Sequence, residues 1–420
     1  NELIENQYNE WDKIFNKSKD NSLPNYKNDT NYKLLNIVID SIEKIKSEVK
    51  YIIFLGDFLT HDFNNKFLKA IEGLNIDKNN DLLRSFIKKT IGFISLKLSS
   101  ILKDIPIYFS LGNTDSFSGD YMLEDNGIFL SSTADLLFKN FIKNKDNKSS
   151  FYNTYPKHGY YSMMVDGLEN LKVISLCSVF FSEKYKSLKN VNKKNAIENE
   201  QLDWLESEFE NAIINKQKLC IIGHIPPGVD VRDTIIKSEK ENLKVVTEWK
   251  SNYNDRYLEL LNRYSDNIMF YFAGHVHMDD YRIINKNDSN RSNFIKIVPS
   301  ISPVFENNPA YQLISIDEEN YSILDIETYY INFAESEPKI KKEYSFKNKY
   351  NQTPTIVGLE SILNNIKDDG FARQLYEKFY SVESKEYIIT SHWKWYYCGI
   401  KSLHKSSYKS NMHSINKQKV

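Results

Sequence analysis

The stretch YIIFLGD, residues 51–57, is a short apolar run that ends in Gly-Asp. A run of this length, without polar alternation and closed by a turn residue, is typical of a buried parallel strand. Before it, apolar residues recur at helical spacing between residues 33 and 49, which predicts an amphipathic helix. A helix that leads into a buried strand is the repeating unit of an α/β fold.

The same unit recurs three more times along the chain. The expected helices cover 81–102, 198–215 and 254–264, and the apolar runs that follow them cover 105–113, 218–228 and 268–277. Further short strands are expected at 160–165 and 172–178, and residues 281–332 have mostly strand-like patterns. Helix-strand alternation followed by a β meander predicts an α/β sandwich with two sheets.

Both ends of the chain differ from this central part, residues 33–335. Residues 1–32 are polar and rich in Asn and Lys, and we expect an irregular N-terminal arm. Residues 336–420 begin with a polar connector and continue with helical patterns at 356–368 and 370–381 and a Trp/Tyr-rich stretch at 392–403. We therefore expect a helical C-terminal subdomain packed on the main body.

Composition excludes several classes of function. With 55 basic and 56 acidic residues the net charge is −1, and no basic block stands apart from acidic residues, so nucleic-acid binding is not expected. The three cysteines show no CxxC spacing, which argues against a disulfide framework. The chain contains no apolar stretch of membrane-spanning length and no visible signal-peptide pattern,.

Candidate chemistry collects where four of the predicted strands end. Each end carries a glycine followed by a residue that can bind a metal: Gly56-Asp57, Gly112-Asn113, Gly223-His224 and Gly274-His275-Val276-His277. In open α/β sheets, ligand sites form outside the carboxyl ends of the strands, so these groups are expected to converge. Asp, Asn and His suit Zn, Mn and Fe. A single Gly-His or a lone Asn would be only a turn, but four such ends favour a metal site.

The order GD … GN … GH … GHxH resembles the signature of the calcineurin-like metallophosphoesterases. Longer matches are similar to the acid sphingomyelinase-like phosphodiesterase branch: GDFLTHD (56–62), GHIPPG (223–228), GHVHMDDYR (274–282) and PSISPVFENNPAYQLISID (299–317). The resemblance runs from about residue 33 to about residue 400. It implies a four-layer sandwich of two β-sheets flanked by helices, with residues 33–335 as the catalytic domain and a helical C-terminal subdomain.

The resemblance also implies a dinuclear site of two divalent ions, zinc by preference, with Mn or Fe as alternatives. Asp57 would bridge the ions, Asn113, His224 and His275 would complete one site, and His277 would bind the other ion. A metal-bound hydroxide would then attack a phosphodiester. His61 corresponds to a family histidine near the leaving group, although it could equally be a surface hydrogen-bonding residue. Substrate contacts are expected from His61, Thr114 and Tyr311.

Two departures from the family pattern bear on activity. The family's first motif, Asp-x-His on the opening strand, occurs nowhere in this chain. Either it lies on a segment upstream of Asn1, which we expect, or the first metal site is incomplete. The family usually has GNH[E/D], whose His protonates the leaving group, whereas this chain has Thr114. A threonine hydroxyl is no acid near neutral pH, and losing general acid catalysis costs about 10²–10⁴ in rate. His61 could replace it, the leaving group could need no acid, or activity could be degenerate.

From these observations we predict that the protein is a phosphodiesterase. Its substrate would be a sphingomyelin or phosphocholine-type ester or a nucleotide. The alternatives are a catalytically impaired pseudoenzyme that serves as a binding protein, and a polyphosphatase or phosphomonoesterase. A purely structural α/β protein would require the four strand ends to be coincidental. By resemblance the protein is expected to be secreted or in a lysosome- or vacuole-like compartment, with membrane contact allowed but no spanning segment. The sequence does not set the oligomeric state.

Overall fold

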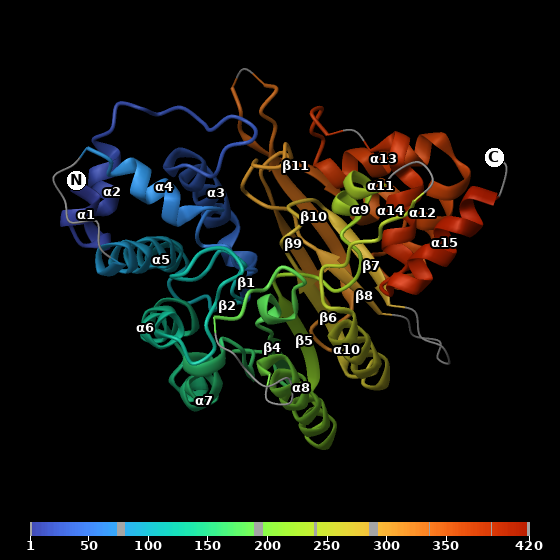
Figure 1. Cartoon of the computed structure of the whole chain (residues 1–420), viewed down its shortest axis with the longest axis horizontal. Coiled ribbons are helices and arrows are strands. Elements are labelled where there is room, and N and C mark those ends of the chain that lie inside the picture. Colours follow the sequence, from blue (N-terminus) through green and yellow to red (C-terminus); the bar gives the residue numbers. More distant parts are fainter. Residues whose placement is uncertain are drawn as a thin grey trace.

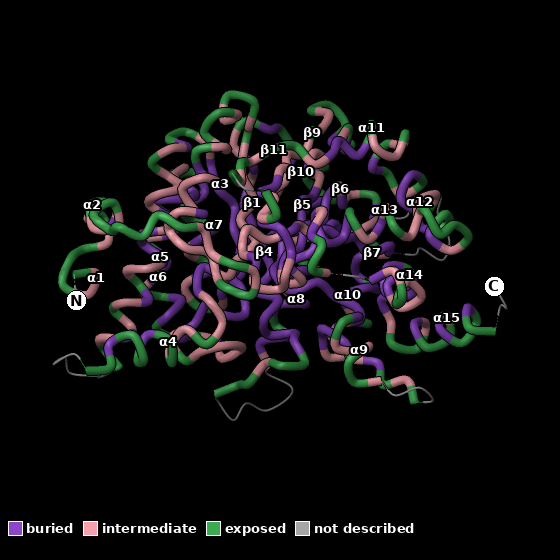
Figure 2. Tube along the Cα trace, turned by 90° about the horizontal axis from the view of Figure 1, so that it is seen from above, coloured by how far each residue is buried: buried purple, intermediate pink, exposed green. Residues whose placement is uncertain are grey.

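A computed structural model describes residues 2–73, 80–188, 196–238, 242–284, 293–335, 337–387 and 389–417. Within these ranges the N-terminal helices lie at one end of the molecule, the strands in the centre and the C-terminal helices at the other end (Figure 1). Buried residues concentrate along the central strands (Figure 2). Part of the expected β meander, residues 285–292, lies outside the described residues, as do residues 336, 388 and 418–420 of the expected C-terminal subdomain.

The largest sheet has six strands in the order β3-β4-β5-β6-β8-β7. Its strands are β3 (Tyr161–Met164), β4 (Leu171–Ser175), β5 (Lys218–Gly223), β6 (Ile268–Ala273), β7 (Asp280–Ile284) and β8 (Asn293–Ile297). The central pairs β4-β5, β5-β6 and β6-β8 are parallel, and the edge pairs β3-β4 and β7-β8 are antiparallel. The carboxyl ends of β5 and β6 therefore lie at the same edge, which brings two of the predicted strand ends together.

The other two strand ends belong to a separate, parallel pair, β1 (Ile52–Phe54) and β2 (Ile107–Phe109). The antiparallel strands β9 (Ala310–Ile316), β10 (Ile323–Ile331) and β11 (Ile340–Ser345) form a third sheet in the order β11-β10-β9. The expected sandwich is confirmed, but its hydrogen bonds divide the described strands into three sheets instead of two. The additional sheet is the pair of β1 and β2, because β1 pairs with no other described strand. β1 is half-buried, whereas we expected a buried strand.

Helices cover the sheets and agree with most of the predicted segments. Those before and between the strands are α3 (Tyr32–Ile45), α4 (Phe63–Ala70), α5 (Asn80–Leu102), α6 (Ile128–Leu137), α7 (Lys148–His158), α8 (Ile197–Ile214), α9 (Val231–Lys237) and α10 (Ser251–Arg263). Local capping explains where some of them begin: the Asn31 side chain accepts a hydrogen bond from the Leu34 N–H at the start of α3,. No helix in the described ranges is both long and apolar enough to cross a bilayer.

The N-terminal residues are more ordered than an irregular arm. They form short helices α1 (Glu2–Glu5) and α2 (Trp11–Asn16) before an extended stretch that leads to α3. Trp11 is 2% exposed and packs its ring 5.3 Å from that of Phe86 and 5.6 Å from that of Phe93 in α5. Burial of this indole holds the segment on the body of the protein, an effect that the polar composition of residues 1–32 concealed.

The C-terminal region begins with a strand that the sequence did not reveal. We expected a polar connector, yet β11 pairs with β10 and is followed by α11 (Phe346–Tyr350), α12 (Ile356–Asp368), α13 (Gly370–Ser381), α14 (Trp393–Lys401) and α15 (Lys405–Lys417). Two exposed lysines make β11 look polar, but Tyr344 on it is 4% exposed. The division into three regions at residues 32 and 335 remains a prediction.

Cys177, Cys220 and Cys398 are all buried free thiols. This agrees with the absence of a disulfide framework.

Candidate metal centre

Three of the predicted ligands meet directly. His224, in the loop after β5, places Nε2 3.1 Å from Oδ2 of Asp57 and 3.0 Å from Oδ1 of Asn113. The ring of His275, after β6, lies with its centroid 5.2 Å from that of His224. Residues from two separate sheets therefore converge at one place, as the strand ends predicted.

The close approach of the β1 and β2 loops requires glycine. A Cβ at Gly112 would lie 2.1 Å from Oδ1 and 2.2 Å from the backbone nitrogen of Asp57. Gly56 has φ +92°, and a Cβ there would lie 2.4 Å from the nitrogen of Gly112. Any side chain at either position would push the two loops apart. The glycines thus allow Asp57 and Asn113 to be neighbours.

His224 has a defined tautomer. Its Nδ1 lies 2.5 Å from the carbonyl oxygen of Leu55, and because a carbonyl can only accept, Nδ1 carries the hydrogen,. In the neutral ring, Nε2 then presents a lone pair to the oxygens of Asp57 and Asn113. Three acceptor atoms that face one another repel unless a proton or a cation lies between them. Accordingly the Asp57 carboxylate keeps the pKa of His224 above its ordinary value, although burial opposes this.

Asp57 is held as a carboxylate. Its Oδ1 accepts the backbone N–H of Thr114 at 3.1 Å and lies 2.8 Å from the Thr114 hydroxyl. Burial alone would raise its pKa, but His224, His275 and the Thr114 N–H bring the pKa of Asp57 well below its usual range,. A charged oxygen therefore faces Nε2 of His224 near neutral pH.

The two histidines of the GHVH segment are neutral, and one of them has a ring nitrogen without a hydrogen-bond partner among the described residues. Both have left-handed backbones, with φ +69° at His275 and +67° at His277. Burial lowers the pKa of His275 to about 3 and that of His277 to about 4. Nδ1 of His277 is buried and makes no hydrogen bond within the described residues. A neutral imidazole with a free ring nitrogen is the form that binds metal ions.

These donors fit a divalent cation: a charged carboxylate oxygen, an amide oxygen and imidazole nitrogens. The arrangement is incomplete, however. Among the residues that the structure describes, no three His, Cys, Asp or Glu side chains are placed to hold one ion together. The trio of Asp57, Asn113 and His224 contains only two such residues, so the ligand roles of all five predicted residues remain predictions.

Asp115 is a part of the site that sequence analysis missed. Its buried carboxylate accepts three backbone N–H groups, from Gly112 at 2.8 Å, Asp57 at 3.0 Å and Leu59 at 3.3 Å. Burial, together with the Asp57 charge, raises the pKa of Asp115 to about 7. These bonds tie the loop after β1 to the loop after β2. The signal was its position two residues after Asn113, where a short carboxylate can bond back to the backbone.

Thr114 is 2% exposed, and its hydroxyl lies 2.8 Å from both Asp57 Oδ1 and the Leu59 carbonyl oxygen. Tyr311 lies in β9, where its hydroxyl bonds Ser41 at 2.8 Å and its ring stacks on Tyr329. Neither of these contacts of Tyr311 is with the predicted metal ligands Asp57, Asn113, His224, His275 and His277. The substrate-binding roles assigned to Thr114 and Tyr311 remain predictions, and both side chains have structural partners.

A cavity of about 260 Å³, with charged and apolar side chains in its lining, lies beside the cluster. His61 and His275 both line it, and Tyr380 and Tyr387 come to it from the C-terminal region. Its other lining residues are Tyr121, Lys184, Val229, Asp230, Val231, Arg232, Asp233, Glu248, Val276, Met278, Arg282 and Phe305. The cavity therefore joins a possible leaving-group histidine, a predicted metal ligand and charges of both signs.

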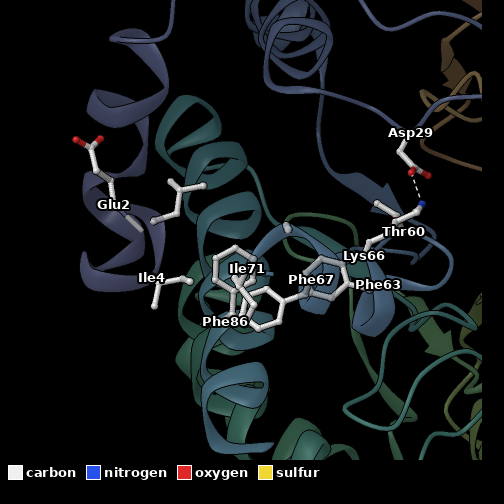
Figure 3. A pocket seen from close by; sticks show the side chains of 11 residues that line it. Glu2, Ile4, Asp29, Thr60, Phe63, Lys66, Phe67, Ile71 and Phe86 are labelled. Atoms are coloured by element: carbon white, nitrogen blue, oxygen red, sulfur yellow. Dashed lines mark hydrogen bonds and ion pairs between the residues drawn. The ribbon is translucent and has the colours of Figure 1, made fainter. Parts of the chain in front are cut away.

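A larger cavity, of about 560 Å³, lies between the N-terminal helices, α4 and α5 (Figure 3). Apolar side chains line most of it, among them Phe63, Phe67 and Phe86, and an ion pair between Lys66 and Asp29 lies at one side. Its described lining residues include no histidine or cysteine, so we place the candidate site at the smaller cavity.

Oxygen and nitrogen atoms that could bind a ligand lie outside the ends of parallel strands and beside a cavity, which is where the class of open α/β proteins binds ligands. The chain belongs to the calcineurin-like phosphoesterase family, whose model matches residues 27–279. Members of this family use divalent metals.

Among the curated relatives, cyclic GMP-AMP phosphodiesterase SMPDL3A of Homo sapiens is 25% identical over 334 residues, 78% of this chain and 65% of that protein. Sphingomyelinase phosphodiesterase C of Dictyostelium discoideum is 25% identical over 335 residues, 77% of this chain and 67% of that protein. The chain thus spans about two thirds of the length of these relatives. Their names confirm the sphingomyelinase-like branch. A solved dimetal phosphatase from Danio rerio is 12% identical, with a TM-score of 0.40, and the match covers 73% of this chain and 88% of that one.

Proposed function

We propose that the protein is a metal-dependent phosphodiesterase whose active centre is the cluster of Asp57, Asn113, His224, His275 and His277. The observation that carries this proposal is the meeting of Nε2 of His224 with the oxygens of Asp57 and Asn113, at 3.1 and 3.0 Å. When the His224 ring is neutral these are three acceptors, which a proton or a cation between them would hold together, and we infer a cation. Membership of the calcineurin-like family and relatives named as phosphodiesterases support the choice of reaction.

In this proposal Asp57, Asn113, His224 and His275 hold one ion, and Asp57 and His277 contribute to a second. Bound divalent cations of this kind activate water and neutralise charge on phosphoryl oxygens. Imidazole ligands suit zinc, which we propose as the metal, with manganese or iron as alternatives. The protein's own residues fix the ligands: Leu55 orients His224, and Asp115 holds the Asp57 loop. His61, at the cavity, supplies the proton to the leaving group.

The substrate is a phosphodiester with either a phosphocholine-type or a nucleotide head, since the two relatives are named as a sphingomyelinase phosphodiesterase and a cyclic GMP-AMP phosphodiesterase. A secreted or lysosome-like location belongs to the same proposal. The competing possibility is a pseudoenzyme that binds ligands without turnover. It is favoured by Thr114, whose buried hydroxyl is engaged with Asp57 and Leu59.

Metal content and hydrolysis distinguish these possibilities. The purified protein is expected to bind about two divalent ions per chain and to hydrolyse bis-p-nitrophenyl phosphate. His275→Ala should lower the rate by about 10²–10³, because it removes an imidazole at the centre. His404→Ala is the matched control: it is the same change at a His whose side chain is 45% exposed and pairs with Asp255. Metal binding without turnover at any pH would instead support a pseudoenzyme, and a chain that binds no metal would contradict the proposed centre.

A pH profile tests His61 as the acid. Its Nδ1 lies 2.8 Å from Asp120 Oδ2, and this hydrogen bond raises the pKa of His61 despite burial. The protonated ring, and with it activity, is lost as pH rises through that raised pKa. Asp120→Asn should lower the pKa of His61 and move the alkaline limb of kcat/KM to lower pH. His61→Ala should cost about 10²–10⁴ with an alkyl leaving group and far less with p-nitrophenolate, which needs no acid.

The matched control is Asp125→Asn, because Asp125 makes the same kind of contact, 2.6 Å to Nδ1 of His158, and neither residue is among those that line the cavity. Its pH profile should be that of the wild type. An alkaline limb that stays in place in Asp120→Asn would rule out His61 as the group that controls it.

A further inference from the structure

The candidate ligand histidines differ in how their second ring nitrogen is satisfied. In His224 the Leu55 carbonyl oxygen accepts the Nδ1 hydrogen, so Nε2 is the ligand nitrogen. In His275 the polar group behind the ring is different: Nε2 lies 3.5 Å from Oε2 of Glu248. When Glu248 is ionised its carboxylate can only accept, so a neutral His275 with its hydrogen on Nε2 keeps the lone pair of Nδ1 free for a metal.

Glu248 is buried where an unpaired charge is costly. It is 7% exposed and lines the cavity. Three cations line the same cavity, and each has another contact. Lys184 Nζ lies 3.7 Å from both Asp230 and Asp233, Arg282 pairs with Asp280, and the exposed Arg232 lies over the Phe305 ring. Burying a carboxylate without a hydrogen-bond donor is strongly unfavourable. Glu248 is therefore stabilised most if His275 carries its hydrogen on Nε2 and directs it at the carboxylate.

The backbone holds Glu248 firmly at this place. Its N–H donates to the Gly228 carbonyl oxygen at 2.9 Å, and its carbonyl accepts the Glu183 N–H at 3.0 Å. The adjacent Trp249 is fully buried and donates its indole N–H to the Ile225 carbonyl oxygen at 3.0 Å. Gly228 and Ile225 both belong to the GHIPPG segment that carries His224. The carboxylate is thus built into the same loop system as the candidate ligands.

We propose that Glu248 is a positioning residue for His275: it accepts the Nε2 hydrogen and so presents Nδ1 to the metal. This inference rests on the proposed metal centre. The 3.5 Å separation is long for a hydrogen bond,, and such contacts tighten when the ligand is bound. Carboxylates behind metal-binding histidines fix the tautomer and the ring orientation, and their loss costs about 10–100-fold in metal affinity.

The test is a Zn²⁺ titration of the full chain against a chromophoric chelator. Glu248→Ala should weaken the affinity of one ion by about 10–100-fold, while the stoichiometry at saturating Zn²⁺ stays that of the wild type. Glu248→Gln keeps a neutral acceptor and should lose less. Asp233→Asn is the matched control: Asp233 lines the same cavity, and its ion pairs within the described ranges are with lysines, so the Zn²⁺ affinity should stay within about twofold. Melting of the metal-free variants checks that they fold.

Three results would overturn the inference. Unchanged Zn²⁺ affinity in Glu248→Ala would show that His275 needs no carboxylate behind it. An equal loss of Zn²⁺ affinity in Asp233→Asn would show that the effect of Glu248→Ala comes from the net charge of the cavity. A lost equivalent of Zn²⁺ at saturation would make Glu248 a direct ligand. If the wild type itself binds no Zn²⁺, the proposed metal centre is wrong, and the role of Glu248 with it. If the wild type binds Zn²⁺ and Glu248→Ala binds it equally well, only the role of Glu248 is wrong.

Discussion

Asp57→Asn is expected to lose bound metal and at least about 10³-fold in rate, the largest catalytic effect among single substitutions. Asp57 is the only carboxylate placed directly at the four strand ends, and its pKa lies well below the usual range, so it supplies the negative charge of the site. Asparagine keeps the size of the side chain but removes the charge and one acceptor oxygen. Metal content by elemental analysis and kcat with bis-p-nitrophenyl phosphate measure the two effects.

Asp62→Asn is the control, since Asp62 is exposed, lies in the same loop and bonds Asn65. It should retain metal and rate. The metal-free Asp57→Asn protein should still fold, because the amide oxygen of the introduced asparagine could accept the Thr114 N–H that Asp57 accepts now. A variant that keeps its full metal content and a rate within about tenfold of the wild type would exclude Asp57 as a bridging ligand.

Lys296→Met is expected to destabilise the protein by about 3–5 kcal/mol, the largest stability effect that we predict. Lys296 is 3% exposed, and its ammonium contacts the Asp279 carboxylate. Asp279 also accepts hydrogen bonds from Gln312, Thr328 and Tyr344. Removing the cation leaves a buried carboxylate with neutral donors only. Urea unfolding followed by circular dichroism measures the change in the free energy of unfolding.

Two variants make this prediction specific. Lys342→Met breaks an ion pair with Glu327 in which the lysine is 45% exposed, and it should cost at most about 1 kcal/mol. Asp279→Asn added to Lys296→Met removes the stranded charge and should recover part of the stability. If Lys296→Met costs no more than Lys342→Met, the buried pair does not stabilise the fold as we infer.

This network also links the candidate site to the C-terminal region. Asp279 follows His277 by two residues, and its backbone N–H donates to the Tyr380 carbonyl oxygen in α13 at 3.0 Å. Asp280 accepts a hydrogen bond from Tyr376, in the same helix, at 2.9 Å. Loss of the buried charges should therefore disturb the loop that carries His275 and His277 as well as global stability.

The strand-end residues could be found from the sequence because each has a local signal. An apolar run, a glycine and a polar residue lie next to one another in the chain, and the structure brings Asp57, Asn113, His224 and His275 together. The helices at 356–368 and 370–381 were also predictable, since α12 and α13 have these bounds. β11 was not predictable, because its exposed lysines concealed a strand that only pairing with β10 stabilises.

The sequence by itself determined the α/β class, the helix-strand order and which residues end the strands. These depend on periodicity and turn chemistry among near neighbours. Tertiary structure alone decided that Nε2 of His224 faces Asn113, 111 positions earlier, that Asp115 ties the two loops together, and that Glu248 lies behind His275. Such contacts join residues without a shared local pattern, and their distances are set by how the sheets and loops pack.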